Sequence, residues 1–279
     1  MEDPTAARVA TRALRDAGFL VVLDDVGVKS ANLDRIAQIQ PDIIKADRAL
    51  VSGVSDDYHQ REVLRSLVHL SERLGGWVIA EGVETADEAV TVAELGGDMV
   101  QGYLLGRPRR ADPDEDVQWD ESRMGEVARR FRERRLGTAR ALRTRREQRS
   151  ALVLSVAEGL GRVGDGDLDT ALARLIEPHA TVLSAAVLDE SGVQITAPVL
   201  NPMRFLRPKT VIFAPPARGV DHSLKEYFYL LVGSDADPYE SPPYVPLPTG
   251  DLAVTLSTRF GAGRVLALHV RAEPGDLAP

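Results

Sequence analysis

Polar side chains that could perform acid–base or metal chemistry follow four short apolar segments in the first 110 residues. They are Asp24 and Asp25 after the first segment, Lys45 and Asp47 around the end of the second, Glu81 after the third and Gln101 at the end of the fourth. The carboxyl ends of parallel strands are where α/β folds place their ligand sites. The pattern therefore indicates a shared site. The alternative for the Asp24–Asp25 pair alone is helix capping, which is common after strands.

The apolar segments alternate with helical patterns, and together they must position these side chains. Reading the chain in order, we predict a helix from Asp3-Pro4 to Ala17, a strand Phe19–Leu23 buried on both faces, a helix Asn32–Ile39, a strand Ile43–Lys45, a helix ending at Leu74, a strand Trp77–Ala80, a helix opened by the capping box of Thr85 and Glu88, and a strand Met99–Gln101. This order is typical of a (β/α) barrel whose site lies on its top face, here with about four βα units.

Composition limits the classes of protein. The chain has 279 residues, a net charge of −8 and no cysteine. The absence of cysteine excludes disulfides, thiolate metal ligands and a cysteine nucleophile. The negative charge argues against a nucleic-acid partner. We expect no membrane span, because no apolar run approaches about 18 residues, and a cytoplasmic protein.

Four ordered motifs resemble a known family. The segments LDDVG, IIKAD, VIAEGVET and VQGYLLGRP closely resemble the second half of the EAL-type cyclic di-GMP phosphodiesterases, which typically read LDDFGTG, LKID, VAEGVET and QGYLFSRP. The resemblance covers residues 1–110. It implies part of a TIM-like barrel and hydrolysis of one phosphodiester bond of cyclic di-GMP, giving pGpG, by metal-activated water.

The resemblance also implies roles for individual residues. Asp24 and Asp25 match metal ligands, and their hard oxygens suit Mg²⁺ or Mn²⁺. Lys45 matches the lysine that holds the water and offsets negative charge on the phosphate, and Glu81 matches a metal-linked catalytic base. The remaining matches are Asp47 and Gln101 in substrate binding and Glu84 in anchoring the loop after the aspartates.

Two departures from the family pattern make us expect impaired catalysis. The family's first half, with the Glu-Ala-Leu motif and further metal ligands, has no counterpart here. The loop Val26–Asn32 also differs from the family's Phe-Gly-Thr-Gly-Tyr-Ser-Ser. A true phosphodiesterase, a non-catalytic cyclic di-GMP receptor and a dimerisation or scaffold protein remain three alternatives. Open sheet edges predict a homodimer or larger assembly, because a monomer would expose apolar surface.

The remaining residues predict a linker and a second domain. Residues 111–163 contain an arginine-rich helix, about Glu121–Arg162, whose interspersed acids favour a solvated linking helix over a lipid- or nucleic-acid-binding one. Residues 164–279 read as an α+β module. Its expected elements are helices Leu168–Ile176 and Leu224–Leu231, strands Val182–Leu188, Val193–Thr196, Leu252–Ser257 and Val265–Val270, and a hairpin loop Arg259–Arg264.

This module resembles the PAS-like Cache sensory domains that follow EAL domains, through VLDESGVQITAPV, HSLKEYFYLL and GRVLALHV. The resemblance implies a small-molecule pocket under Tyr227–Tyr244. We expect Arg218, Tyr227, Tyr239 and Asp251 to line it. The ligand is an unidentified small molecule.

Overall fold

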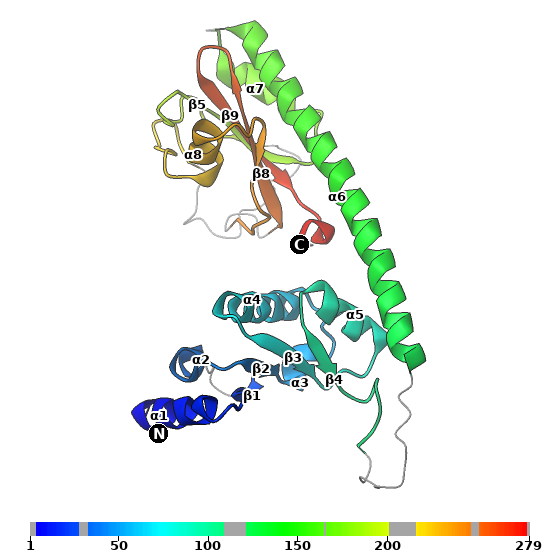
Figure 1. Ribbon diagram of the computed structural model, residues 1–279. Helices are drawn as coiled ribbons and strands as arrows, with labels where there is room; N and C mark the ends of the chain where they lie inside the picture. Colours follow the sequence, from blue (N-terminus) through cyan, green and yellow to red (C-terminus); the bar gives the residue numbers. More distant parts are fainter. Residues whose placement is uncertain are drawn as a thin grey trace. The chain divides into compact units, whose positions relative to one another are not determined.

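The computed structural model describes residues 4–27, 33–108, 121–164, 166–200, 216–246 and 251–277. The chain forms two compact units that divide between Gly137 and Thr138, inside the long helix α6, Glu121–Val163 (Figure 1). Across the described part of the chain, no helix has the length and apolar character needed to span a membrane.

The first unit is a parallel sheet with helices on one face. Its strands are β1 (Val22–Val26), β2 (Ile43–Ala46), β3 (Trp77–Glu81) and β4 (Met99–Gln101), in the order β1-β2-β3-β4. Its helices before α6 are α1 (Pro4–Asp16), α2 (Leu33–Ile39), α3 (Arg48–Val51), α4 (Tyr58–Leu74) and α5 (Ala86–Glu94). Strand residues such as Leu23, Ile44 and Val78 form one core with helix residues such as Leu64 and Val90. The α/β class with a parallel sheet is confirmed, and four βα units are consistent with part of a TIM-like barrel.

The first strand begins later than the sequence predicts. Pairing starts at Val22 with Ile43, whereas Phe19 and Leu20 are exposed and precede the strand. Gly18 ends the preceding turn with a positive φ of 86°. The residues after it, up to the first pair at Val22, connect this turn to the sheet. The prediction that this strand is buried on both faces is also wrong, because Val22 is exposed on an edge strand.

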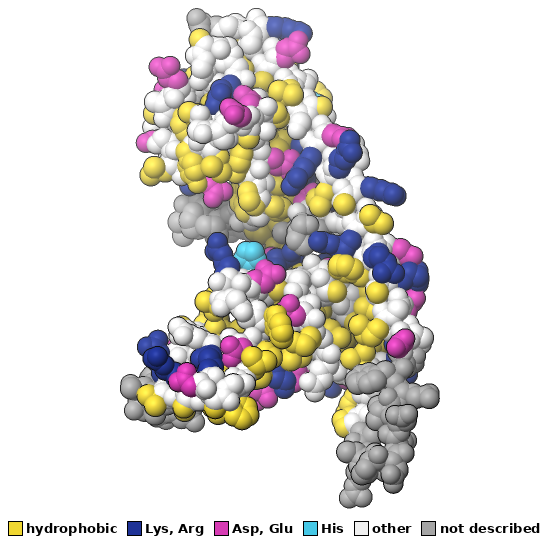
Figure 2. Space-filling model, in the orientation of Figure 1, with side chains coloured by type: hydrophobic (Ala, Val, Ile, Leu, Met, Phe, Trp, Pro, Cys, Tyr) yellow, Lys and Arg dark blue, Asp and Glu magenta, His cyan; other side chains and the backbone are white. Residues whose placement is uncertain are grey.

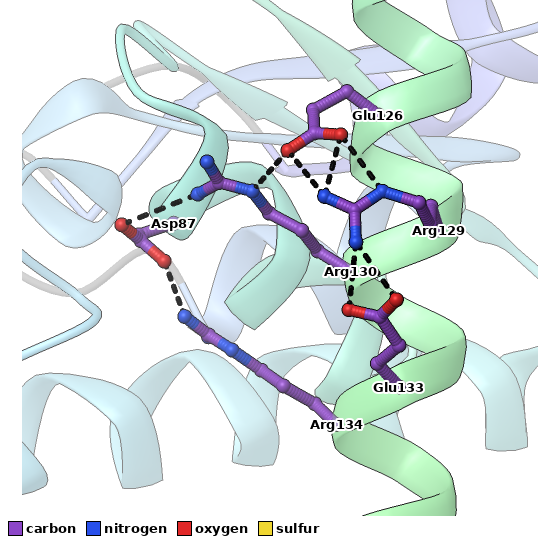
Figure 3. Close-up of polar contacts among 6 residues, drawn as sticks. All are labelled: Asp87, Glu126, Arg129, Arg130, Glu133 and Arg134. Atoms are coloured by element: carbon purple, nitrogen blue, oxygen red, sulfur yellow. Dashed lines mark hydrogen bonds and ion pairs between the residues drawn. The ribbon is translucent and has the colours of Figure 1, made fainter.

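The arginines at the start of α6 are largely paired. Arg130 and Arg134 reach Asp87 on α5, and Arg129 lies between Glu126 and Glu133 one turn away on either side (Figure 3). Pairs at this spacing support a solvated helix. Val127 and Phe131, on the same stretch, pack against the core of the parallel-sheet unit. This part of α6 is therefore a structural helix of the first unit.

The second unit is an antiparallel sheet between helices. Its strands are β5 (Val182–Leu188), β6 (Val199–Leu200), β7 (Tyr239–Glu240), β8 (Ala253–Phe260) and β9 (Arg264–Arg271), in the order β6-β5-β9-β8-β7. The end of α6 and α7 (Leu168–Ile176) pack on one face through residues such as Val156, Leu160 and Leu172, and α8 (Glu226–Gly233) packs on the other through Phe228 and Leu231 (Figure 1). A short 3₁₀ helix, Pro274–Leu277, follows β9.

The helices and strands expected in this unit form, except at one strand. The two short helices form, with α8 two residues later than expected. The hairpin joining β8 and β9 also forms, but its loop is shorter than predicted, because Arg259 and Phe260 belong to β8 and Arg264 begins β9. Residues 193–196 form no strand and make only bridges, from Gln194 to Leu188 and from Val193 to Asp221. The Asp189 carboxylate accepts from the backbone N–H of Val193, and the N–H of Gln194 donates to Val220. Local turn bonds therefore replace a continuous ladder.

A buried arginine ties α6 to the end of the second unit. The guanidinium of Arg149 donates to Glu240 Oε1 at 2.9 Å and to Asp276 Oδ2 at 2.5 Å. Arg145 adds contacts to Asp276 and Glu273. Because Arg149 and Asp276 are both buried, removing one partner leaves a desolvated charge.

We expect Arg149→Ala to lower the free energy of unfolding of the second unit by about 3 kcal/mol, the cost of breaking a buried pair. The control is Arg146→Ala, which removes an exposed arginine from the same helix. Urea denaturation followed by circular dichroism measures the difference. Superimposable curves for the two variants would contradict a structural role for the Arg149 pairs.

Candidate active site

Three polar side chains from neighbouring strands meet at the carboxyl edge of the parallel sheet. Lys45 on β2 lies between Asp24 on β1 and Glu81 on β3. Its Nζ atom is 3.0 Å from Asp24 Oδ1 and 2.5 Å from Glu81 Oε1. The three residues lie on the face of the sheet opposite the helices, because the alternate residues Leu23, Ile44 and Ala80 enter the core.

A bulge in β1 brings the second aspartate to the same place. Pairing with β2 shifts register between Leu23 and Val26, and Asp25 adopts a left-handed backbone with φ of 58°. Such a conformation is uncommon outside glycine, and bulges often re-aim side chains beside active sites. Carboxylate oxygens of Asp24, Asp25 and Glu81 consequently lie within 4.8 Å of one another.

The charges at this edge stabilise one another. The hydrogen bond from Lys45 lowers the pKa of the Asp24 carboxyl below its usual value. Hydrogen bonds to Glu81 and then Asp24 raise the pKa of the Lys45 ammonium. At neutral pH the lysine is therefore a fixed cation between carboxylates.

The three carboxylates fit a hard divalent cation. They supply only oxygen donors, as Mg²⁺ and Mn²⁺ prefer, and two of them are exposed to solvent, which could complete the shell. Lys45 competes for two of the same carboxylates, so a bound ion would share them with the ammonium. Here the ion would supply a Lewis acid for water activation.

A pocket beside the carboxylates is lined by further residues from the motifs. They are Asp47, Arg48, Glu81, Gly82, Glu84, Gln101, Gly102 and Tyr103. Glu84 pairs with Arg48 at 3.0 Å, and Asp47 caps α3 by accepting from the N–H of Ala49 at 2.7 Å. The predicted partner of Glu84, the loop after the aspartates, lies largely outside the described residues. All seven residues that the sequence predicted for this site thus lie at the carboxyl edge of the sheet or line the pocket beside it.

Sequence reasoning missed two residues that shape this pocket. Arg48 carries no motif signal, and its aliphatic stem packs so closely over Gly82 that a Cβ there would lie 2.6 Å from Arg48 Cγ. Glu88 was noted only as a capping-box residue. Its buried carboxylate accepts from the N–H groups of Gly53, Glu84 and Thr85. Burial opposes its ionisation, but these bonds lower its pKa overall, and they fix the Glu81–Thr85 turn.

The four residues expected to line a sensor pocket lie in different settings. Arg218 pairs with Asp169 on the surface, and Asp251 is exposed. Tyr239, in β7, packs against the cluster of Leu188, Phe228, Leu231 and Val265. Tyr227 is the member that points into the second unit, where its hydroxyl contacts His222 Nδ1 at 2.5 Å.

Around Tyr227 lies a hydrogen-bonded network on the α8 side of the antiparallel sheet. It links Gln194, His222, Tyr227, Tyr244, Thr255 and His269 through hydrogen bonds and the edge-on contact of Tyr227 with His269. Burial lowers the pKa of His269 to about 4 and also lowers that of His222, so both are neutral at pH 7. The two histidines lie in the segments HSLKEYFYLL and GRVLALHV, but no sequence signal indicated that they share one network, because they lie 47 positions apart in the chain.

The comparisons with known proteins agree with the motifs at the parallel sheet. Residues 1–108 match the EAL domain family. The chain is 35% identical over 96 residues to the probable cyclic di-GMP phosphodiesterase PdeA of Escherichia coli, covering 34% of this chain and 13% of that protein. It is 36% identical over 95 residues to the cyclic di-GMP phosphodiesterase RocR of Pseudomonas aeruginosa, covering 34% of this chain and 24% of that one. Residues 1–108 are thus similar to part of the EAL-type cyclic di-GMP phosphodiesterases, and the chain spans less than a quarter of the length of these two relatives.

One solved structure resembles almost the whole chain. It is the Bacillus subtilis YkuI protein, which has an EAL domain and was solved with substrate cyclic di-GMP and calcium. The likeness has a TM-score of 0.77 and 22% identity, and covers 98% of this chain and 67% of YkuI. At this identity the likeness shows a shared fold and carries no statement about ligands.

We expect Lys45→Met to raise the pKa of the Asp24 carboxyl toward its ordinary value, because the largest cause of its lowering is the hydrogen bond from Lys45. Carbon-13 NMR titration of the Asp24 carboxyl measures this change. Lys225→Met, which removes a lysine from the second unit, is the matched control. An unchanged Asp24 titration in Lys45→Met would contradict the contact.

Proposed function

We propose that residues 1–108 bind cyclic di-GMP together with Mg²⁺ or Mn²⁺, in a signalling protein of EAL phosphodiesterase ancestry. The observation that carries this proposal is the convergence of Asp24, Asp25 and Glu81 around Lys45, within the segment that matches the EAL family. The carboxylates would hold the cation. The cation and Lys45 would face the negatively charged phosphates.

The neighbouring residues have roles consistent with this ligand. Glu81 would serve as the metal-linked base, and Asp47 and Gln101 would contact the nucleotide from the pocket they line. Glu84, held by Arg48, would keep the Glu81–Gly82 turn in place. The ammonium of Lys45 would offset charge on the phosphate and orient a water molecule.

Turnover by this chain is a separate matter, and we propose that it is negligible. A Mg²⁺ ion takes six ligands in near-octahedral geometry and is usually held by one or two carboxylates, several waters and substrate oxygens. A phosphodiester hydrolysis that uses two metal ions would require these three carboxylates to bind both ions, although two of the three also pair with Lys45. We therefore propose that the chain binds cyclic di-GMP without hydrolysing it. The alternative is a dimerisation or scaffold role without nucleotide, favoured by the exposed apolar side chains of the first unit (Figure 2).

The second unit would be the sensory part. An antiparallel sheet with a polar network beneath α8 is compatible with a PAS-like or Cache-like module that binds a small molecule near Tyr227. We propose a cytoplasmic homodimer in which this module influences the EAL segment. Neither nucleic acid nor a membrane is a proposed partner.

In the proposed receptor, cyclic di-GMP binding measured by calorimetry should require Mn²⁺ and should be lost in Asp24→Asn, because that change removes a charged metal ligand. Asp56→Asn, an exposed acid outside the pocket, is the control. Chromatography of the same samples should detect no linear pGpG. Formation of pGpG that disappears in Asp24→Asn would show an active phosphodiesterase instead.

A sensory role for the second unit predicts ligand-dependent stability. In a thermal-shift screen of the full chain with amino acids, nucleotides and carboxylates, a ligand present at a hundred times its Kd should stabilise this unit by about 2.7 kcal/mol. Tyr227→Ala should abolish the shift, whereas Tyr229→Ala, which removes an exposed tyrosine of α8, should retain it. A screen with no shift would leave a structural cap as the role of this unit.

A further inference from the structure

Helix α8 covers only part of its face of the antiparallel sheet. At one end of this face, Leu188 on β5 and Val265 on β9 are buried in the cluster beneath α8. Further along the same face, Ser184 and Ala186 on β5 and His269 on β9 are only half-buried. Both strands lie inside the sheet, between β6 and β8, and Ser184 pairs directly with His269. Solvent therefore reaches the middle of the sheet beside α8.

Gln194 fixes the direction of the hydrogen bonds in the network around Tyr227. Its amide Nε2 donates to the carbonyl oxygens of Thr196 and Pro216, at 2.9 and 3.0 Å. Because the amide nitrogen is held by these two acceptors, the atom of Gln194 that faces His222 is the oxygen Oε1. That oxygen can only accept, so Nε2 of His222 carries a proton and donates it over 3.0 Å.

The next hydrogen bond in the network runs from Tyr227 to His222. Burial lowers the pKa of His222, so its ring is neutral at pH 7 and Nδ1 is left as an acceptor. Burial also raises the pKa of Tyr227, which therefore keeps its hydroxyl proton. The single proton of that hydroxyl is donated to His222 Nδ1. The oxygen of Tyr227 consequently presents only lone pairs to any further molecule.

His269 has one ring nitrogen inside the network and one facing solvent. Nδ1 lies 2.8 Å from the Tyr244 hydroxyl and 3.0 Å from Thr255 Oγ1, and both hydroxyls can rotate to suit it. No hydrogen bond joins Nε2 to the described part of the chain, where the single buried side-chain polar atom without a partner is Ser71 Oγ. Solvent therefore reaches Nε2. The rings of His269 and Tyr227 meet edge-on with centroids 6.0 Å apart, so one small molecule can contact both.

The network carries no charge at neutral pH. Burial lowers the pKa of His269 to about 4, so this ring is neutral as well, and the other members have hydroxyl or amide side chains. The charged residues that flank the network along the chain, Asp221, Lys225 and Arg271, are exposed to solvent. A charged ligand group buried against the network would lose its hydration without gaining an opposite charge, which is costly. An uncharged ligand avoids that cost.

We propose that the second unit binds an uncharged amide, whose N–H donates to the oxygen of Tyr227 and whose carbonyl accepts from Nε2 of His269. An amide carries both kinds of hydrogen-bonding group and no charge, as these two partners require. Tyr227 sets the preference, because it accepts a hydrogen bond but has no proton left to donate. This proposal rests on the proposed sensory role of the second unit and names its ligand class.

Four compounds built on one aromatic ring test the ligand class. Benzamide is uncharged and donates hydrogen bonds, N,N-dimethylbenzamide is uncharged without a donor, benzoate is an anion and benzamidine is a cation. In scanning calorimetry of the full chain at pH 7, benzamide alone should raise the thermal midpoint of the second unit. An equal rise with any of the other three, or no rise with benzamide, would overturn the proposal.

Tyrosine variants separate the hydrogen bond from the contact with the ring. Tyr227→Phe keeps the ring but removes the accepting oxygen, so it should weaken benzamide binding about tenfold, the effect of one hydrogen bond. Tyr229→Phe alters an exposed tyrosine of α8 and should bind benzamide as the natural chain does. Equal affinity of the two variants would contradict the assigned contact. If another compound of the broad screen shifts the midpoint while benzamide fails, the amide class is wrong and the sensory role stands.

The direction of the hydrogen bonds is measurable without any ligand. Nitrogen-15 NMR of the His222 ring in the full chain, with its signals assigned by their loss in His222→Asn, should show a proton on Nε2 and none on Nδ1. A proton on Nδ1 would overturn the proposal, because the Tyr227 hydroxyl would then be free to donate to a ligand. This result does not depend on whether the second unit is a sensor.

Discussion

The site depends on one cation placed between carboxylates. Without Lys45, the side chains of Asp24 and Glu81 would bring like charges to the same edge of the sheet with little to offset them. The lysine lets three acids gather within 4.8 Å. Lys45 also competes with any bound metal ion, because the ion must share those carboxylates with the ammonium. The same contacts raise the pKa of that ammonium.

Two charged residues beside this edge, Glu88 and Arg48, hold the turn after β3 in one conformation. Glu88 is buried beneath it and binds three backbone N–H groups, and Arg48 closes over Gly82 toward Glu84. A buried carboxylate is stable only when such donors satisfy it. The polar residues that support the site are therefore as constrained as those that would touch a ligand.

In the second unit, the α8 side of the sheet is held together by a network of hydrogen-bonded side chains. Two neutral histidines, His269 in β9 and His222 in the loop before α8, form a network there with tyrosine, threonine and glutamine side chains rather than a purely apolar core. A network of this kind specifies one arrangement when every member is satisfied. On the opposite face, apolar residues of α6 and α7 form the larger core, and Arg149 fixes the chain end to α6.

The sequence by itself determined the parallel α/β character, the four strand-end polar positions and the long helix. The spacing of apolar residues, the glycines that end helices and the residues that cap them are all signals carried by neighbouring positions in the chain. It placed Lys45, Glu81 and Gln101 correctly at strand ends. Only the tertiary structure decided that β1 begins at Val22 and that a bulge turns Asp25 toward the site, since strand register depends on the neighbouring strand. The contacts of Arg48, His222 and His269 were likewise invisible in the sequence, because their partners lie far along the chain and are brought together by packing alone.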